Sequence, residues 1–517
     1  MNSIEMRSSL LARNTIMNFF GQLIPLIIGV STIPFVIRSL GSDSFGILGL
    51  AWAVLGYFSL FDLGLGRATT QFVAGALGKG ETEKLPHLIW TSLGIHLLLG
   101  LMGGLLLAIL TPLLVERVFN IPPALIADTK NTFFILAISV PVILTSTVLR
   151  GVLEASQRFD LVNAVKVPSG SLIFLLPVAG ILIGFGLPGI VFFLMMARLG
   201  AALAYLILCL KIFPILKKSF SFDSKIIRPL LSYGGWVTVS NVISPVLVYL
   251  DRFVIGSLIS MSAVAYYTAP YEVITRLWIF PSSLTSTLFP AFSTIGTTSK
   301  EILVDFYTRS IKYLLLIMGL LVIVLILFAG DILHLWLGGE FAKKSTPVFQ
   351  ILAVGVLFNS LAQIPFALLQ GLSRPDLTAK FHILEVLLYI PLVCFLVKSM
   401  GIAGGALAWT LRVTLDALLL FWASWKLYDM NPRVLAEHGI LRGIGALALL
   451  AGGLAASLFL NRTLLMQSAI TAILIVLFGL TSWRYVLNIR DREFMVSIAR
   501  KFSKMINKNP CEVQNAK

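Results

Sequence analysis

Three arginines stand far from the ends of long apolar segments. Arg198 is about ten residues from the start of its segment, Arg276 about twelve and Arg412 about ten. An α-helix rises about 1.5 Å per residue and a bilayer core is about 30 Å thick, which predicts that all three lie near the middle of a membrane. Because a guanidinium group binds phosphate through a planar, bidentate fork, we expect these arginines to line a cationic substrate-binding cavity.

Neutralisation within one helix is the alternative interpretation for two of these arginines. Glu272 precedes Arg276 by four residues and Asp416 follows Arg412 by four, so each pair shares one helix face. Arg198 has no acidic residue four positions away on either side. The sequence therefore leaves both interpretations open for Arg276 and Arg412, and it favours a cavity position for Arg198.

Several carboxylates also lie in or beside apolar segments. Charged groups in such positions are costly and often carry function. For each carboxylate the two interpretations are a carrier of a coupling proton or cation and a plain ion-pair partner. The four are Asp62, Glu272, Glu385 and Asp416. His382, a lone histidine near the expected inner end of a helix, is assigned a structural role.

Two adjacent charges, Asp251 and Arg252, lie toward the expected outer end of the segment 230–251. At that depth they would be near the level of the lipid headgroups. We interpret them either as a structural pair or as an outer gate.

The composition identifies the class of protein that positions these charges. Of the 517 residues, 57% are hydrophobic and only 12% are charged, which is typical of a polytopic membrane protein. The net charge of +16 fits basic cytoplasmic loops, so no nucleic-acid partner is expected. The 3 cysteines lack the spacing of a disulfide framework or a metal site, and no catalytic residue, metal or cofactor is predicted.

Apolar runs of roughly 20 residues predict an all-α membrane protein with about fourteen transmembrane helices. Basic residues gather in alternate loops, which places the N- and C-termini in the cytoplasm by the positive-inside rule. The expected helices are 13–38, 45–66, 88–115, 132–149, 167–187, 188–210, 230–251, 263–290, 311–329, 347–369, 379–398, 402–427, 442–460 and 468–487.

The first six and the next six expected helices carry repeated motifs. Arg-Phe-Asp-Leu at 158–161 recurs as Arg-Pro-Asp-Leu at 374–377, and Gly-Leu-Pro-Gly at 186–189 recurs as Gly-Ile-Ala-Gly at 401–404. Such a parallel repeat predicts two like-oriented lobes that rock about a substrate site near the membrane midplane. The predicted organisation is an N-terminal lobe at 1–220, a C-terminal lobe at 221–430, an accessory helix pair at 431–490 and a basic cytoplasmic tail at 491–517. The tail is interpreted as either an interfacial helix or a plain basic extension.

Several stretches resemble the polysaccharide-transport branch of the multidrug/oligosaccharidyl-lipid/polysaccharide exporter superfamily, which includes the O-antigen flippases. The resemblance covers roughly residues 10–430, and 230–256 is its most specific part. The stretches are LFDLGLGRATTQFVAGALGKG (60–80), LRGVLEASQRFDLVN (149–163), LLSYGGWVTVSNVISPVLVYLDRFVIG (230–256) and LQGLSRPDL (369–377).

This resemblance implies a carrier for undecaprenyl-pyrophosphate-linked oligosaccharide, such as an O-antigen, capsule or exopolysaccharide unit. It implies movement from the inner to the outer leaflet of the bacterial inner membrane by alternating access, coupled to a proton or cation gradient. The lipid bilayer and other polysaccharide-assembly membrane proteins are the further partners that it implies. A lipid II-type flippase remains an alternative within the superfamily.

The intramembrane charges and the loop lengths argue against two other classes of function. A multidrug or cation antiporter would need an acidic, aromatic cavity, whereas the expected cavity is rich in arginine. A membrane glycosyltransferase or polymerase would need a large outer loop or an acidic cluster at one membrane face. The expected outer loops are short, the largest near 116–131 and 330–346, so we expect a transporter and not an enzyme.

Overall fold

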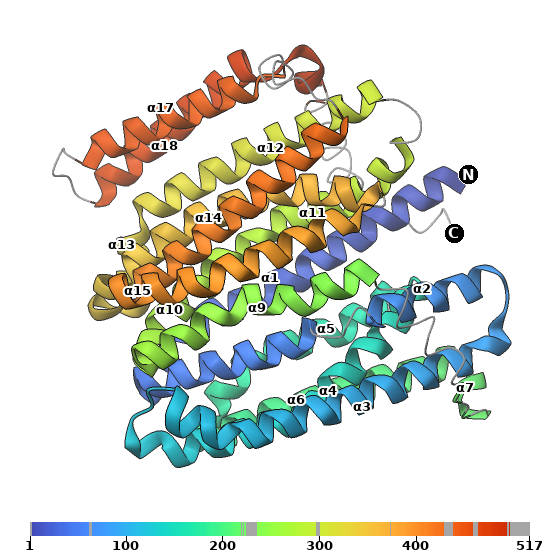
Figure 1. Cartoon of the computed structure of the whole chain (residues 1–517). Helices are drawn as coiled ribbons and strands as arrows, with labels where there is room; N and C mark the ends of the chain where they lie inside the picture. Colours follow the sequence, from blue (N-terminus) through green and yellow to red (C-terminus); the bar gives the residue numbers. More distant parts are fainter. Residues whose placement is uncertain are drawn as a thin grey trace, which may run out of the picture.

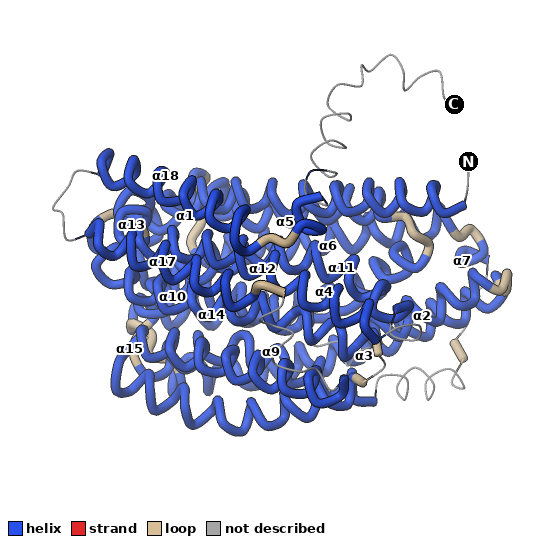
Figure 2. The backbone as a smooth tube through the Cα atoms, turned by 90° about the horizontal axis from the view of Figure 1, so that it is seen from above, coloured by secondary structure: helices blue, strands red, loops and turns tan. Residues whose placement is uncertain are grey.

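The fold is helical throughout the part of the chain that the structure describes. A computed structural model describes residues 3–60, 65–218, 220, 222–223, 235–295, 300–372, 374–428, 438–458, 464–493 and 496. No strand occurs in these ranges (Figure 2). Ten helical segments within them are long and apolar enough to cross a membrane. The predicted all-α, polytopic fold is confirmed.

The first half of the chain forms one side of the bundle (Figure 1). In it, α3 packs on α4, α4 on α6, and α1 on α5. Its helices are α1 (Ser3–Leu60), α2 (Leu65–Gly78), α3 (Leu85–Leu113), α4 (Ile126–Ala155), α5 (Phe159–Leu182), α6 (Leu187–Ile212) and the short α7 (Ile215–Lys218).

The second half packs against the first through α1, which contacts both α9 and α10. Within this half, α15 packs on α14 and on α9. Its helices are α9 (Gly235–Leu258), α10 (Met261–Ile274), α11 (Ile279–Ile295), α12 (Lys300–Leu327), α13 (Ala329–Leu337), α14 (Gly339–Gly371) and α15 (Pro375–Tyr428). The short 3-10 helix η4 (Thr275–Trp278) connects α10 to α11.

Two of the long helices are each a pair of helices joined at a glycine. Gly41 in α1 has φ 79° and Gly401 in α15 has φ 62°. Such positive φ values are unfavourable for residues with a Cβ, and glycine adopts them readily. Each kink falls between two expected helices, and several helices extend beyond the expected apolar runs. The total of about fourteen spans stays a prediction.

The two copies of the repeated Arg-x-Asp-Leu motif adopt the same local geometry. Arg158 Nε lies 3.0 Å from Asp160 Oδ1 at the start of α5, and Arg374 Nε lies 2.9 Å from Asp376 Oδ1 at the start of α15. The internal repeat and the two lobes remain predictions, which this agreement favours.

One end of the bundle, at the left of Figure 1, is closed by contacts between the two halves. The backbone N–H of Ser262 donates to Asp43 Oδ1 over 2.9 Å. Asn120 Nδ2 donates to the carbonyl of Ile259 over 2.6 Å, and the rings of Phe119 and Phe253 stack 6.0 Å apart. We call this region the closed end.

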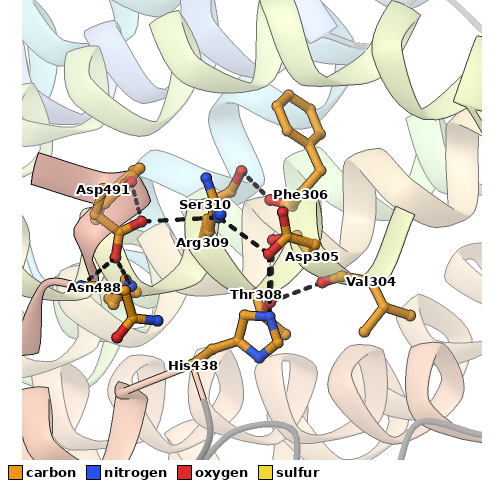
Figure 3. A network of polar contacts seen from close by, with 11 residues as sticks. Val304, Asp305, Phe306, Thr308, Arg309, Ser310, His438, Asn488 and Asp491 are labelled. Atoms are coloured by element: carbon orange, nitrogen blue, oxygen red, sulfur yellow. Dashed lines mark hydrogen bonds and ion pairs between the residues drawn. The ribbon is translucent and has the colours of Figure 1, made fainter. Parts of the chain in front are cut away.

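The last two helices, α17 (Ile440–Leu458) and α18 (Leu464–Thr481), lie at the outer edge of the bundle beside α12 (Figure 1). A buried ion pair between Lys312 of α12 and Asp491 fixes them there, and both residues are 0% exposed. Asp491 also accepts a hydrogen bond from Tyr313 Oη. It accepts another from the backbone N–H of Asn488, which Figure 3 shows beside it. Burial acts to raise the pKa of Asp491, but these hydrogen bonds outweigh it and the pKa is lowered.

We therefore expect Asp491→Asn to destabilise the protein strongly. The substitution leaves the Lys312 ammonium buried without its charge partner, a loss that typically costs about 3–5 kcal/mol. The measurement is thermal unfolding of the purified protein in detergent. Glu83→Gln, on the exposed 3-10 helix η1 (Thr82–Lys84), is the control and leaves the melting temperature unchanged. Equal melting temperatures for wild type and Asp491→Asn would contradict this role.

Candidate functional site

A cavity of about 310 Å³ lies between α1, α5 and α6 on one side and α9, α10 and η4 on the other. We call it the central cavity. It contains Arg198 and Arg276, two of the three arginines expected at mid-depth, and these come from opposite halves of the chain. Lys166 and Arg252 also line it, and Glu272 is the one carboxylate among its described lining residues. The lining is therefore strongly cationic.

The cations of the central cavity differ in how they are held. Glu272 lies between Arg252 and Arg276, with O···N distances of 3.4 and 3.1 Å. Arg252 is almost fully buried, and its guanidinium carbon lies 4.3 Å from the centre of the Tyr271 ring. The side chain of Arg276 is more than a third exposed. Arg252 and Glu272 thus form a fixed wall, and Arg276 can still reach a ligand.

Unlike Arg252 and Arg276, Arg198 forms no ion pair with a carboxylate in the described ranges. Its Nε is buried and has no hydrogen-bond partner in the described ranges. An unsatisfied buried donor is costly, so the site favours an acceptor that the chain itself does not supply. A phosphate oxygen is an acceptor that fits a guanidinium fork.

A second cavity of about 310 Å³ continues from the central one between α4, α5 and α6. The two share Lys166 and Arg198, and the second adds Arg150, which lies near the end of α4. We call it the inner cavity. Arg150 forms an ion pair with Glu154, in which Nε lies 3.4 Å from Oε1. The cationic lining therefore continues from the central cavity to Arg150, near the end of α4. This end of the bundle also holds α2 and α7 (Figure 1).

Sequence reasoning missed Lys166 and Arg150 as cavity residues. Both were assigned to a basic inner loop, because the apolar runs end at 149 and begin again at 167. In the structure α4 continues to Ala155 and α5 begins at Phe159, so both side chains project from helices. Extending the expected helices through these charges would have placed both residues on helices rather than in a loop.

Arg412, the third expected arginine, does not reach the central cavity. It lines a separate cavity of about 290 Å³ with His382, Asp416 and Trp278. Its Nη1 lies 3.2 Å from Glu385 Oε2, on the other arm of α15. Arg276 does form the expected ion pair with Glu272 on its own side of the helix. Arg412 instead pairs with Glu385, which lies on the other side of the Gly401 kink.

Three side chains beside Arg412 form a compact buried cluster. The ligand atoms of His382, Glu385 and Asp416 all lie within 4.8 Å of one another. Glu385 Oε1 and Asp416 Oδ1 are buried without a hydrogen-bond partner in the part of the chain described. Buried charges need compensation, so two carboxylates beside one guanidinium can take up a proton or a small cation. We call this group the carboxylate cluster.

The remaining predicted site residues lie elsewhere. Asp251 is fully buried and accepts hydrogen bonds from Tyr267 Oη and, over 2.7 Å, from the backbone N–H of Arg252. The two side chains therefore have different partners. Asp251 binds Tyr267 within the second half, and Arg252 pairs with Glu272 in the wall of the central cavity. Asp62 lies outside the described residues.

Comparison with known proteins gives the family context of this geometry. The profile of the family described as polysaccharide biosynthesis protein matches residues 11–296. A protein of Shigella flexneri described as a candidate O-antigen transporter is 33% identical over 79% of this chain and 96% of its own length. A candidate flippase of Haloferax volcanii, AglR, is 25% identical over 93% of this chain and 97% of its own.

Solved structures share the fold at low sequence identity. The lipid II flippase MurJ in an inward closed conformation superposes with a TM-score of 0.70 at 13% identity, covering 92% of this chain and 99% of that one. An inward-facing multidrug resistance MATE family transporter of the MOP superfamily gives a TM-score of 0.69 at 18% identity, covering 79% of this chain and 94% of that one.

Proposed function

We propose, from the premise that the chain belongs to the polysaccharide biosynthesis protein family, that it is a flippase for a lipid-linked oligosaccharide. It is a multi-pass membrane protein and a transporter rather than an enzyme, in line with its named relatives. In this proposal it turns an undecaprenyl-pyrophosphate-linked unit of O-antigen, capsule or exopolysaccharide from the inner to the outer leaflet. The membrane is the bacterial inner membrane, and both termini are cytoplasmic.

The observation that carries this proposal is the cationic lining of the central cavity. Lys166, Arg198, Arg252 and Arg276 face one carboxylate, Glu272, among the described lining residues. A cavity of this sign attracts the negative pyrophosphate and repels the cationic substrates of a drug antiporter. The cations come from both halves, so a bound pyrophosphate would contact both moving parts.

The route follows from which end of the bundle is closed. Contacts between the halves seal the closed end, and the inner cavity extends the cationic lining toward the opposite end. By the positive-inside rule, that opposite end is the cytoplasmic one. We infer an inward-open state in which the pyrophosphate enters past Arg150 and reaches Arg198 and Arg276. Rocking of the two lobes would then open the closed end.

The carboxylate cluster is the proposed coupling site. Its proton or cation would bias the second lobe between two arrangements, because a ligand shifts an equilibrium only by its differential affinity for the two states. His382 and Asp416 of the cluster line the same cavity as Trp278, the last residue of η4. Binding of a proton or cation to the cluster can therefore shift η4, which also carries Arg276.

We expect Asp416→Asn to abolish stimulation of flipping by an imposed proton or sodium gradient. The slower, equilibrating flipping should remain, because the central cavity is unchanged. The assay compares flipping with and without the gradient in the same liposomes. Asp331→Asn, at an exposed carboxylate of α13, is the matched control and keeps the stimulation. Full stimulation in Asp416→Asn would remove this cluster from the coupling mechanism.

The experiment that tests the proposed function is a substrate panel with the wild-type protein in liposomes. The panel holds a fluorescent prenyl-pyrophosphate oligosaccharide, lipid II and a cationic dye. The rate at which each inner-leaflet compound becomes accessible outside is measured. Protein-dependent movement of the oligosaccharide, without transport of the dye, is the expected result. Transport of the dye alone would identify an antiporter, and movement of lipid II alone would identify a lipid II-type flippase.

A further inference from the structure

Another basic cavity, which shares no lining residue with the central or the inner cavity, lies where α12 and α17 begin and the chain leaves α18. Its volume is about 590 Å³. Five arginines line it, with Asp305 as the one carboxylate among its described lining residues. We call it the arginine pocket, and its arginines are Arg309, Arg442, Arg484, Arg490 and Arg492.

Two of the five arginines build the floor of the pocket. Arg309 Nε lies 3.1 Å from Asp305 Oδ1 and 3.8 Å from Asp491 Oδ1 (Figure 3). Arg492 donates to the backbone carbonyls of Leu487 and Arg484, over 3.1 and 2.9 Å. The buried Lys312–Asp491 pair holds this floor in place.

The other three arginines face outward with their charges uncompensated. Arg442, Arg484 and Arg490 are exposed, and none forms an ion pair with an acid in the described ranges. Arg442 reaches only the carbonyl of Tyr485, over 3.4 Å, and Arg484 lies 5.7 Å from the centre of the Tyr485 ring. Three guanidiniums therefore converge on one opening, and no described carboxylate forms an ion pair with any of them.

The rim of the pocket is apolar and exposed. Tyr485 is 61% exposed and Ile489 is 73% exposed, and both line the pocket. Leu441, next to Arg442, is 58% exposed. Aromatic and aliphatic side chains next to basic ones mark the level at which acyl chains meet headgroups. The starts of α12 and α17, which border the pocket, lie at the same end of the bundle as the start of α1 (Figure 1). That end is the expected cytoplasmic face.

From this arrangement we propose that the arginine pocket binds the phosphate headgroup of an anionic phospholipid of the inner leaflet. Basic pockets between transmembrane helices on the cytoplasmic side recognise such headgroups. The apolar rim distinguishes this ligand from free phosphate, because it offers contact to acyl chains that a soluble ion lacks. The bound lipid would fasten α17 and α18 to α12. This inference is independent of the substrate assigned to the central cavity.

The test measures lipid binding to the purified full-length protein by native mass spectrometry. Phosphatidylglycerol and phosphatidylcholine are titrated against wild type, Arg490→Gln and the double variant Arg442→Gln/Arg490→Gln. Removing one arginine should weaken phosphatidylglycerol binding about fivefold, and removing both about 25-fold. Arg38→Gln/Arg117→Gln removes equal charge at exposed positions away from the pocket and is the matched control. Thermal unfolding confirms that each variant is folded.

The expected result is preference for phosphatidylglycerol over phosphatidylcholine, lost in the pocket variants and kept in the control. Arg490 is exposed and supports no other described side chain through an ion pair, so its single variant tests the pocket even if the double variant unfolds. Equal loss in the control would mean nonspecific charge attraction and would overturn the proposal. Displacement of the lipid by millimolar inorganic phosphate, or binding of a prenyl pyrophosphate only, would overturn it as well.

Discussion

Replacing both Arg198 and Arg276 with glutamine should slow the flipping of a prenyl-pyrophosphate oligosaccharide by about 100-fold or more. A hydrogen bond to a charged group contributes about 1.5–3 kcal/mol, which is about tenfold or more in rate for each arginine if it acts in the transition state. Glutamine keeps an N–H donor, but it is shorter than arginine by two bonds and lacks the charge and the bidentate fork. The measurement is the appearance of the labelled sugar outside liposomes.

The controls separate cavity chemistry from folding. Glu272 keeps its contact with Arg252 when Arg276 is replaced, so no carboxylate loses all its partners. Nε of Arg198 has no hydrogen-bond partner in the described ranges, so its replacement breaks no known bond there. Arg117→Gln, an exposed change outside the cavity, should flip at the wild-type rate. Wild-type rates in the double variant would rule out these arginines as the pyrophosphate site.

Gly46→Leu should force the closed end apart and stop transport. A Cβ at Gly46 would lie 1.8 Å from the backbone carbonyl oxygen of Met261 in α10. A Cβ essentially never lies within 3.0 Å of another heavy atom, so α1 and α10 would have to separate by roughly 1 Å or more. A carrier that cannot close one end cannot alternate. The closed end would then leak or stay open, and coupled flipping would be lost.

Separation of α1 and α10 at the closed end can be measured directly by disulfide cross-linking. Asp43→Cys and Ser262→Cys stand on the two sides of the closed end, because the native residues form a hydrogen bond of 2.9 Å. In a background without native cysteines this pair should cross-link readily, and Gly46→Leu should suppress the cross-link. Gly452→Leu is the control, since no described atom lies within 4 Å of a Cβ there. An unchanged cross-link in Gly46→Leu would disprove this close approach.

The sequence could predict those features of the site that follow from a residue's position along its own helix. It could not predict which residues of different helices meet. Depth along a helix suggested Arg198 and Arg276, which the structure brings into one cavity. Depth could not give the partner of Arg412, because Glu385 approaches it only through the turn at Gly401. Local spacing had suggested Asp416 instead.

The missed residues have a common physical reason. Hydropathy places the end of a helix at its first charges, although a helix continues as long as its backbone bonds are satisfied. Lys166 and Arg150 were therefore assigned to a loop, and both lie on helices that line the cavities. Lys312 is the second residue of the expected helix 311–329, and in the structure it is buried against Asp491, 179 positions later in the chain. Only tertiary packing creates such a pair.

The most direct test of the central claim is an experimental structure of the protein with a prenyl-pyrophosphate-linked oligosaccharide bound. The account predicts density for the pyrophosphate between α6 and η4, with phosphate oxygens about 2.7–2.9 Å from the guanidinium nitrogens of Arg198 and Arg276. Pyrophosphate density outside the central and inner cavities, with these two arginines in contact with protein groups only, would contradict it.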